Sequence, residues 1–388
     1  MAGGQYDGAA PFGRRGSANL CDTTAHPPPE TPAVLALLFA AAAIAAAGPG
    51  HMDRAVDVAV SQGFAGEVLV TDTKAVTYAR VVSAPGRPHS RGELWRWASV
   101  TKQLTATLIL QQVAAGKLGL DDTLAKRLPD FKGAGAAQVT IRMLLQHTSG
   151  LPNPDDTPSA GGESTFPTFY LRSSRGVGGP ADAYGYCAGT PKAAPGAGFS
   201  YNNCDFIVLG AVLEHLTGQS FSRLLETQIT RPLGLRSLRM ARSDGPAPRT
   251  VPATLQNGAP EPPFVLATFG PAGAAYGSSD DLVRFHQALL SGRLLTPAVS
   301  RAAWTGDSKL GYVALGVWSF SAPLMGCAEV VELVERRGEI GGVEVRNLLA
   351  PKRGRALIVF ADRAGLEFGE IWQGKGLTYE IASAAFCG

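Results

Sequence analysis

The spacing of apolar positions divides the chain into helical and strand-like segments. Apolar residues three and four apart, typical of helices, occur in six segments: 52–62, 99–115, 139–147, 204–215, 279–290 and 377–386. Runs typical of strands occur in six others: 67–71, 75–79, 312–320, 330–336, 343–349 and 356–361. Strands therefore lie near both ends of the chain, and helices fill most of its middle.

This order of elements predicts an α+β fold. Strands from both ends can join one antiparallel sheet with flanking helices, while the middle forms an inserted, mostly helical lobe. We expect a single domain over residues 51–388, with a sheet lobe at about 52–98 and 300–388 and a helical lobe at about 99–299. The Pro-, Gly-, Ser- and Thr-rich region 152–195 predicts a long loop that gates substrate or is held by a disulfide.

The N-terminal region indicates export. Residues 32–47 are apolar, end in alanines and precede Gly48-Pro49-Gly50. Such a stretch is typical of a signal peptide and is short for a membrane span. We expect residues 1–50 to be a signal peptide with an atypically long leader, and the mature protein to be periplasmic or secreted without stable membrane insertion. A membrane anchor is the alternative interpretation.

Composition narrows the classes of function. Of 388 residues, 45% are hydrophobic and 17% charged, which suffices for a large core. The net charge is only +3 and no basic run is longer than Arg336-Arg337, so we expect no nucleic-acid partner. Known metal-binding and nucleotide-binding motifs are missing from the sequence, so we expect no metal and no cofactor. The oligomeric state is not indicated.

The segment Ser99-Val-Thr-Lys102 carries the first candidate chemistry. Helical residues three apart share a face, so an amine could take the proton of the hydroxyl. Free backbone N–H groups at a helix start could hold a developing oxyanion. Taken alone, however, the tetrapeptide also fits a serine helix cap followed by a solvated lysine.

Two later segments add candidate groups. Tyr201-Asn202-Asn203 places a phenol and an amide just before an apolar helix. The same segment also fits a purely structural role, with a buried aromatic residue and an Asn helix cap. Glu335-Arg336-Arg337-Gly338-Glu339 lies on a predicted late strand, where the glycine would let a substrate backbone approach the sheet. This segment also fits a purely structural role as the exposed, charged end of a strand.

Together, and in this order, the three segments resemble those of the serine β-lactamase and penicillin-binding protein superfamily, nearest the class C β-lactamases and related esterases, DD-peptidases and D-aminopeptidases. Two further segments are similar to family phrases: Met143-Leu-Leu-Gln-His147-Thr-Ser-Gly-Leu-Pro152 and the stretch from Ala272 to Leu282. The resemblance covers about residues 64–386 and implies an active site between the two lobes. We expect His147 to shape a turn rather than to move protons.

The resemblance also implies roles for the candidate residues. Ser99 would be the nucleophile, Lys102 its base and Tyr201 a second proton shuttle. Asn203 would orient Lys102 and bind the substrate carbonyl, while Arg336, Gly338 and Glu339 would bind substrate. The backbone N–H groups of Ser99 and Glu339 would form the oxyanion hole.

Departures from the family pattern shape the expected function. Arg336-Arg337-Gly338 stands where class C β-lactamases have Lys-Thr-Gly, and Asp362 stands where they have an amide. An acid there repels a substrate carboxylate unless Arg336 or Arg363 neutralises it. We therefore expect an exported serine hydrolase acting on a small ester, an amide or a D-amino-acid peptide. A β-lactamase or DD-carboxypeptidase, or a non-catalytic sensor that binds penicillin-type ligands, are the alternatives.

Four cysteines lie beyond the predicted signal peptide. An even number in an exported chain permits two disulfides. We favour Cys187–Cys204, beside the second motif, and Cys327–Cys387, which would tie the last helix to the sheet. The sequence leaves the other two pairings open.

Overall fold

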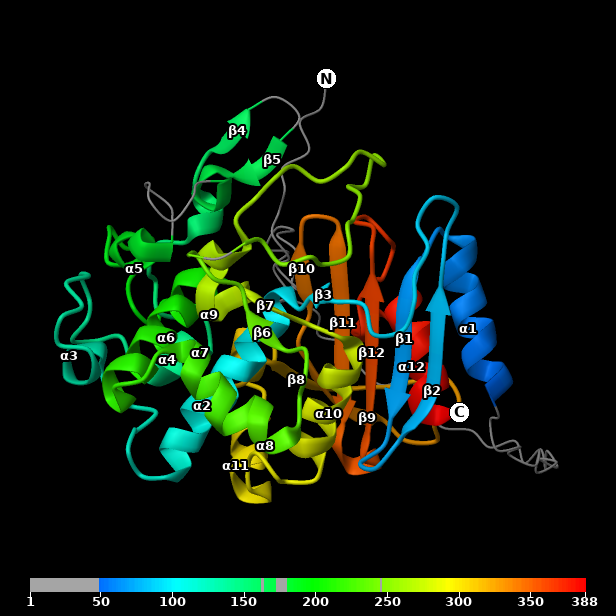
Figure 1. Cartoon of the computed structure of the whole chain (residues 1–388). Helices are drawn as coiled ribbons and strands as arrows, with labels where there is room; N and C mark the ends of the chain where they lie inside the picture. Colours follow the sequence, from blue (N-terminus) through cyan, green and yellow to red (C-terminus); the bar gives the residue numbers. More distant parts are fainter. Residues whose placement is uncertain (1–48, 162–163, 172–179, 245) are drawn as a thin grey trace, which may run out of the picture.

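An antiparallel sheet forms the centre of the protein (Figure 1). The computed structural model describes residues 49–161, 164–171, 180–244 and 246–388, so the predicted signal peptide lies almost wholly outside the described residues. The strand order is β2-β1-β12-β11-β9-β8, and β10 also pairs with β11. The strands are β1 (Gly66–Thr71), β2 (Val76–Val82), β8 (Trp318–Ala322), β9 (Val331–Glu335), β10 (Gly338–Ile340), β11 (Val343–Ala350) and β12 (Arg355–Ala361). Strands from both chain ends therefore share one sheet, which confirms the predicted α+β class.

Helices cover both faces of this sheet. On one face, α1 (Pro49–Ser61) packs beside α12 (Leu377–Cys387), and on the other face α10 (Ser279–Leu290) contacts β1 and β12. Each face has its own hydrophobic core, so Val68 points into one and Leu69 into the other. Because both faces are covered, every residue of β1 is buried. The region that we assigned to the helical lobe thus includes α10, which packs on the sheet.

The helical lobe is built around α2 (Thr101–Ala114), which is buried along most of its length and contacts α6 (Asn203–Thr217) and α9 (Gly270–Gly273). Asn202 caps the start of α6 by accepting from Cys204 N, and Gly218 ends it with a φ of 66°. The other helices of the lobe are α3 (Leu124–Arg127), α4 (Ile141–Leu145), α5 (Pro180–Cys187), α7 (Phe221–Leu225), α8 (Arg231–Leu233) and α11 (Pro297–Ala303).

The structure also contains short strands that the sequence pattern did not predict. The strands β3 (Trp95–Arg96), β7 (Ala275–Gly277) and β6 (Arg239–Met240) form a small sheet, and β4 (Ser159–Gly161) pairs with β5 (Ser164–Pro167). Strands of two or three residues are too short to show alternation. Conversely, the strand predicted from 312 begins only at Trp318, because a tight turn at Gly316, with a φ of 82°, precedes it.

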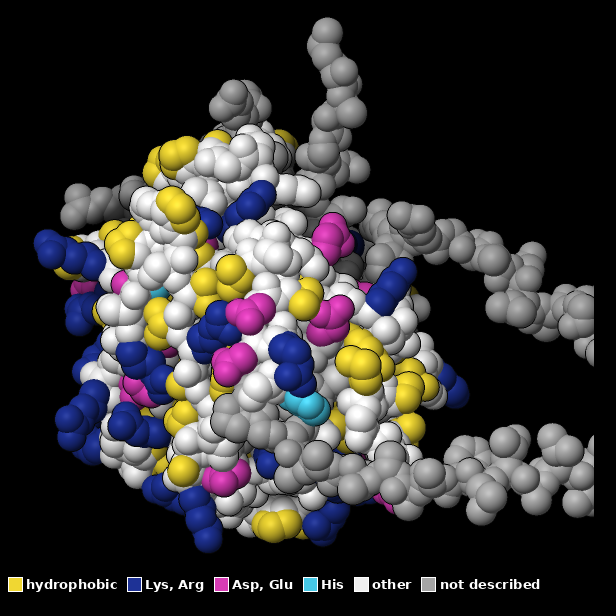
Figure 2. Space-filling model, turned by 90° about the vertical axis from the view of Figure 1, so that its right-hand side faces the viewer, with side chains coloured by type: hydrophobic (Ala, Val, Ile, Leu, Met, Phe, Trp, Pro, Cys, Tyr) yellow, Lys and Arg dark blue, Asp and Glu magenta, His cyan; other side chains and the backbone are white. Residues whose placement is uncertain are grey.

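The edge strand β2 is covered by polar contacts with α1. Tyr78 Oη donates to Asp53 Oδ1 over 2.8 Å, and Arg80 pairs with Asp57 at 2.6 Å. Figure 2 shows acidic and basic side chains interspersed on the side of the molecule that carries these elements. Such contacts limit strand addition at a sheet edge. No helix within the described residues has the length and apolar composition that a membrane span requires.

Candidate active site

Ser99 lies in a constrained turn at the start of α2. The turn spans Ala98–Val100 and continues directly into the helix. Ala98 has a φ of +48°, a conformation that is strained for a residue with a side chain. A Cβ at Gly338 of β10 would lie 2.7 Å from the carbonyl oxygen of Trp97. This glycine therefore lets the sheet approach the turn that carries Ser99, whereas we had predicted an approach by substrate backbone.

Lys102 Nζ makes three polar contacts. Its Nζ donates to Asn203 Oδ1 over 2.6 Å and to the carbonyl oxygen of Ala272 over 2.9 Å. Both partners only accept, so each takes a hydrogen of Nζ whether the amine is neutral or protonated. The remaining contact is with Ser99 Oγ at 3.2 Å. Protonated Nζ donates to this hydroxyl oxygen, and neutral Nζ can accept the hydroxyl proton.

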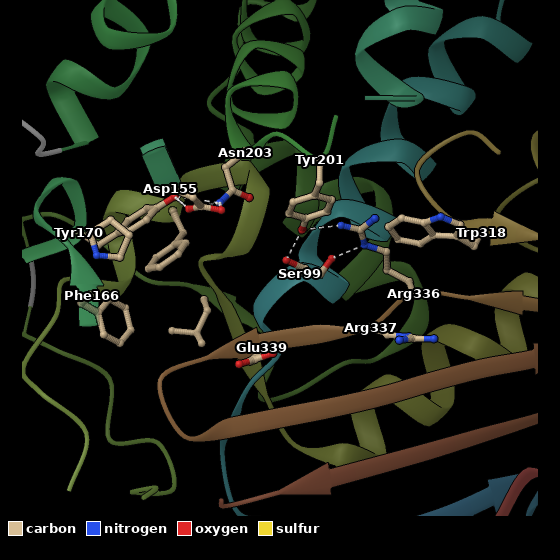
Figure 3. Close-up of a pocket in the computed structure, with 13 residues that line it drawn as sticks. Ser99, Asp155, Phe166, Tyr170, Tyr201, Asn203, Trp318, Arg336, Arg337 and Glu339 are labelled. Carbon is tan, nitrogen blue, oxygen red and sulfur yellow. Dashed lines mark hydrogen bonds between the residues drawn. The ribbon is translucent and has the colours of Figure 1, made fainter. Parts of the chain in front are cut away.

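Tyr201 contacts the same hydroxyl from the loop before α6. Its Oη lies 2.6 Å from Ser99 Oγ, and Arg336 Nη2 donates to Oη over 2.8 Å (Figure 3). Arg336 Nε also donates to the carbonyl oxygen of Ser99 over 2.9 Å. The guanidinium is almost fully buried, and it lies 5.0 Å from the centre of the Trp318 ring. Arg336 thus connects the end of β9 to both hydroxyl-bearing residues.

Burial and charge together set the protonation of these groups. Burial, followed by the positive charge of Arg336, lowers the pKa of Lys102 well below its usual value. Burial also raises the pKa of Tyr201, and the charge of Arg336 opposes that rise. A lysine whose pKa is lowered in this way gives up its proton more readily and can then act as a general base.

Asp155, which the sequence analysis did not single out, completes the polar network. Asn203 Nδ2 donates to both of its carboxylate oxygens, at 3.0 and 3.1 Å, and Tyr170 Oη donates to Oδ1 over 2.6 Å. The Nδ2 group of Asn203 is therefore directed at Asp155. We had predicted that Asn203 would bind the substrate carbonyl, but the protein's own carboxylate occupies that donor.

These groups line a pocket of about 750 Å³, part of which is open to solvent. One wall is aromatic, since Tyr170 and Phe269 stack at 3.8 Å and Phe166 stacks on Phe264 at 5.0 Å. The lining residues are Ser99, Asp155, Phe166, Pro167, Tyr170, Tyr201, Asn203, Phe269, Trp318, Arg336, Arg337, Glu339 and Ile340. All three predicted proton-transfer residues, together with Arg336, Gly338 and Glu339, thus gather at one place between the lobes (Figure 3).

Comparison with known proteins identifies the family. The family model for β-lactamase matches residues 52–327. The chain belongs to the β-lactamase family. Its members are serine hydrolases, and the relatives found include a carboxypeptidase, an esterase and amidases.

Two curated relatives carry different activities in their names. The D-alanyl-D-alanine-carboxypeptidase/endopeptidase AmpH of Escherichia coli is 27% identical over 70% of this chain and 71% of its own. Esterase EstB of Burkholderia gladioli is 30% identical over 46% of this chain and 45% of its own.

Solved structures share the fold. A D-stereospecific amidohydrolase from Streptomyces sp. superimposes with a TM-score of 0.69, at 25% identity, and covers 87% of this chain and 98% of its own. The D-amino acid amidase of Ochrobactrum anthropi, solved with L-phenylalanine amide, gives a TM-score of 0.67 at 20% identity, over 86% of this chain and 97% of its own.

Asp362 and Arg337 are both paired with charged side chains of the protein itself. Asp362 is absent from the pocket lining, and its carboxylate pairs with Arg87 at 2.6 Å and with His89 at 3.1 Å. The partners of Asp362 are therefore supplied by the chain before β3, and not by Arg336 or Arg363. Arg337 reaches the pocket edge but is paired with Glu335 and Glu370.

The Cys187–Cys204 disulfide and His147 support the chain segment beside the site. Both favoured pairs are bonded, and Cys187–Cys204 joins α5 to the residue that follows Asn203. His147 is buried, with Nδ1 3.0 Å from Asp205 Oδ2, and Asn202 N donates to Nδ1 over 3.2 Å. These contacts hold the chain segment that carries Tyr201 and Asn203.

Residues that the sequence analysis missed come mainly from region 152–195. Asp155, Phe166 and Tyr170 carry no motif that distinguishes them from other loop residues. The only signal was the prediction that this long region gates substrate. Trp318 and Phe269 were hidden among ordinary apolar positions.

Proposed function

We propose that the protein hydrolyses an amide or ester bond through an acyl-enzyme on Ser99. The observation that carries this proposal is the contact of Ser99 Oγ with both Lys102 Nζ at 3.2 Å and Tyr201 Oη at 2.6 Å. Neutral Lys102 takes the hydroxyl proton as Oγ bonds to the substrate carbonyl carbon. Tyr201 donates a proton to the leaving amine or alcohol, and water then cleaves the acyl-enzyme.

The oxyanion would be held by backbone donors. We propose the N–H groups of Ser99 and Glu339 for this role, since β10 lies directly beside the nucleophile turn. A Cβ placed on Gly338 would be 3.3 Å from Ser99 N, so the two backbones run in close contact. Two converging N–H groups stabilise a tetrahedral intermediate more than its ground state.

The charges around the pocket favour an amine-bearing substrate over a carboxylate-bearing one. Two nitrogens of Arg336 are directed at Ser99 and Tyr201, and Arg337 is paired with two glutamates. Carboxylates of Asp155 and Glu339 line the same pocket. A protonated amine gains from these negative charges, whereas a β-lactam or a free peptide C-terminus is repelled by them.

The aromatic wall completes the proposed substrate. Phe166, Tyr170, Phe269 and Ile340 offer an apolar surface to a large side chain. We therefore propose an amino acid amide or ester, with the amine near Asp155 and an aromatic or large aliphatic side chain against this wall. The names of the related amidohydrolase and amidase support the D configuration.

A substrate panel tests this proposal. Purified protein is assayed with D-phenylalaninamide, L-phenylalaninamide, N-acetyl-D-phenylalaninamide, p-nitrophenyl butyrate and a chromogenic cephalosporin, with Ser99→Ala as the blank. We expect the free D-amide to exceed its N-acetyl form by at least tenfold in kcat/KM. Cephalosporin turnover far above the ester and amide rates would favour a β-lactamase instead. Stable labelling of Ser99 without turnover of any substrate would favour a sensor.

Export is the second part of the proposal. We propose that the chain acts outside the cytoplasm, because two disulfides are typical of an oxidising compartment. Cell fractionation and N-terminal sequencing of the mature protein test this. Recovery of the intact Met1 form in the cytoplasm would contradict it.

A further inference from the structure

Asp155 is separated from Lys102 by a single amide group. Asn203 Oδ1 accepts from Lys102 Nζ over 2.6 Å, while Asn203 Nδ2 donates to Asp155 on the other side. In the proposed reaction, Lys102 and Tyr201 transfer the protons and the Asp155 carboxylate transfers none. Its position beside the base and in the wall of the pocket nevertheless links substrate charge to the charge of Lys102.

The contacts of Asp155 fit an ionised carboxylate. Asn203 Nδ2 and Tyr170 Oη both donate to it, and an ionised carboxylate only accepts. Hydrogen bonds donated to the charged form favour that form, although burial raises the pKa of Asp155.

Several charged or titratable groups surround Lys102. These groups are Arg336 directly after β9, Tyr201 in the loop before α6, Asp205 in α6, His147 in the turn after α4 and Asp155 in the short helix at 154–156. Arg336 favours the neutral amine, and the two aspartates favour the protonated one.

Of the two aspartates, Asp155 alone is among the described residues that line the pocket. Asp205 is fully buried and bonded to Ser149 and His147. A bound substrate can therefore contact Asp155 but not Asp205. The charge that acts on Lys102 through Asp155 is the one that substrate binding can change.

We propose that Asp155 is a positioning residue that holds a proton on Lys102 in the empty site and gives up this hold when a substrate ammonium pairs with its carboxylate. The proton leaves Lys102 for solvent water, and the neutral amine then accepts the Ser99 hydroxyl proton. The part of this proposal that concerns a substrate ammonium rests on the proposed function. The enzyme would thus be activated by the charge of its own substrate.

The first test follows the pH dependence of Ser99 labelling by a neutral fluorophosphonate, which requires no turnover. In Asp155→Asn we expect the acid limb of the labelling rate to move about one unit toward lower pH, because an opposite charge has been removed from beside Lys102. A role in packing alone would lower the rate at every pH without moving the limb. An unmoved limb overturns the proposal.

Asp156→Asn is the matched control. Its carboxylate is the next in the chain, but it is half-exposed and paired with Lys192 at 2.6 Å. We expect this variant to keep the wild-type limb. A shift equal to that of Asp155→Asn would reduce the effect to general surface charge and contradict a specific role of Asp155.

The second test compares substrates. Phenylalanine p-nitroanilide and its des-amino analogue, 3-phenylpropanoyl p-nitroanilide, differ only in the ammonium group. We expect the acid limb of kcat for the amine to lie about one unit lower in the wild type, and the difference to vanish in Asp155→Asn. Equal limbs in the wild type would overturn activation by substrate. If labelling shifts while the amine substrate is not preferred, the proton-holding role stands and the proposed substrate class fails.

Discussion

Arg336 Nη2 donates a hydrogen bond of 2.8 Å to Tyr201 Oη, and this bond joins the last part of the sheet to the middle of the chain. The guanidinium lies beside both the Tyr201 and the Trp318 ring, 5.3 and 5.0 Å from their centres. Burial is the main cause of the lowered pKa of Lys102, and the charge of Arg336 lowers this pKa further. One side chain thus acts on both of the proposed proton-transfer groups.

Replacing Arg336 is expected to move the pH profile. In Arg336→Gln the pKa of Lys102 rises because a nearby positive charge is lost, so the neutral base is populated only at higher pH. We expect the acid limb of kcat/KM to move up by about one unit. Arg336→Lys keeps the charge and should leave the limb in place while lowering kcat, because one ammonium cannot reproduce the paired guanidinium bonds. An identical profile for both variants would contradict the electrostatic role.

Ser99→Ala is expected to abolish covalent labelling. The hydroxyl is the only group removed, and the turn and α2 remain packed, so the melting temperature should change little. Mass spectrometry after fluorophosphonate treatment measures the first effect and thermal unfolding the second. Labelling that persists at another residue would show that the nucleophile was misassigned.

Tyr201→Phe is expected to slow turnover by about 10² to 10⁴-fold, the range for a lost proton shuttle. The ring contacts remain, while the bonds to Ser99 and Arg336 are lost. Single-turnover kinetics with a p-nitrophenyl ester and with an amide separate acylation from deacylation. A rate equal to that of the wild type would assign proton transfer to Lys102 alone.

We expect both disulfides to contribute to stability, but only one of them to contribute strongly to activity. Cys187–Cys204 closes 17 residues and Cys327–Cys387 closes 60, so loop entropy predicts losses of about 3 and about 4 kcal/mol on replacing each pair by alanine. Only the first pair adjoins Asn203, so we expect kcat/KM to fall mainly in Cys187→Ala/Cys204→Ala. Denaturant unfolding and kinetics at 25 °C test both parts. Equal kinetic losses in the two double variants would refute the local effect.

His286 is expected to weaken the fold in acid. Burial lowers its pKa to about 3, and neither ring nitrogen has a hydrogen-bond partner among the described residues. The unfolded chain binds a proton below about pH 6.5 whereas the folded one does not, so stability falls by about 1.4 kcal/mol per pH unit from there toward pH 3. His286→Leu should lose this part of the pH dependence. Urea unfolding of both proteins at pH 7, 6 and 5 measures the difference, and parallel curves would disprove it.

The longer elements were predictable because their patterns are local. The helices α10 and α12 and the strands β1, β11 and β12 lie within a few residues of their predicted bounds. In contrast, β3, β6 and β7 exist only because three distant segments meet, and none of them is long enough to show a period.

The same division applies to the candidate site. Ser99 and Lys102 face one another through the geometry of a single helical turn, so their spacing in the chain was enough to propose the pair. Other contacts join residues that lie far apart in the chain. Asp155 and Asn203 are 48 positions apart, Tyr201 and Arg336 are 135 apart, and Arg87 and Asp362 are 275 apart. Such contacts depend on how helices and sheet pack against one another. Packing, through burial and the charges it brings close, therefore decided which side chains line the pocket and in which direction the pKa of Lys102 moves.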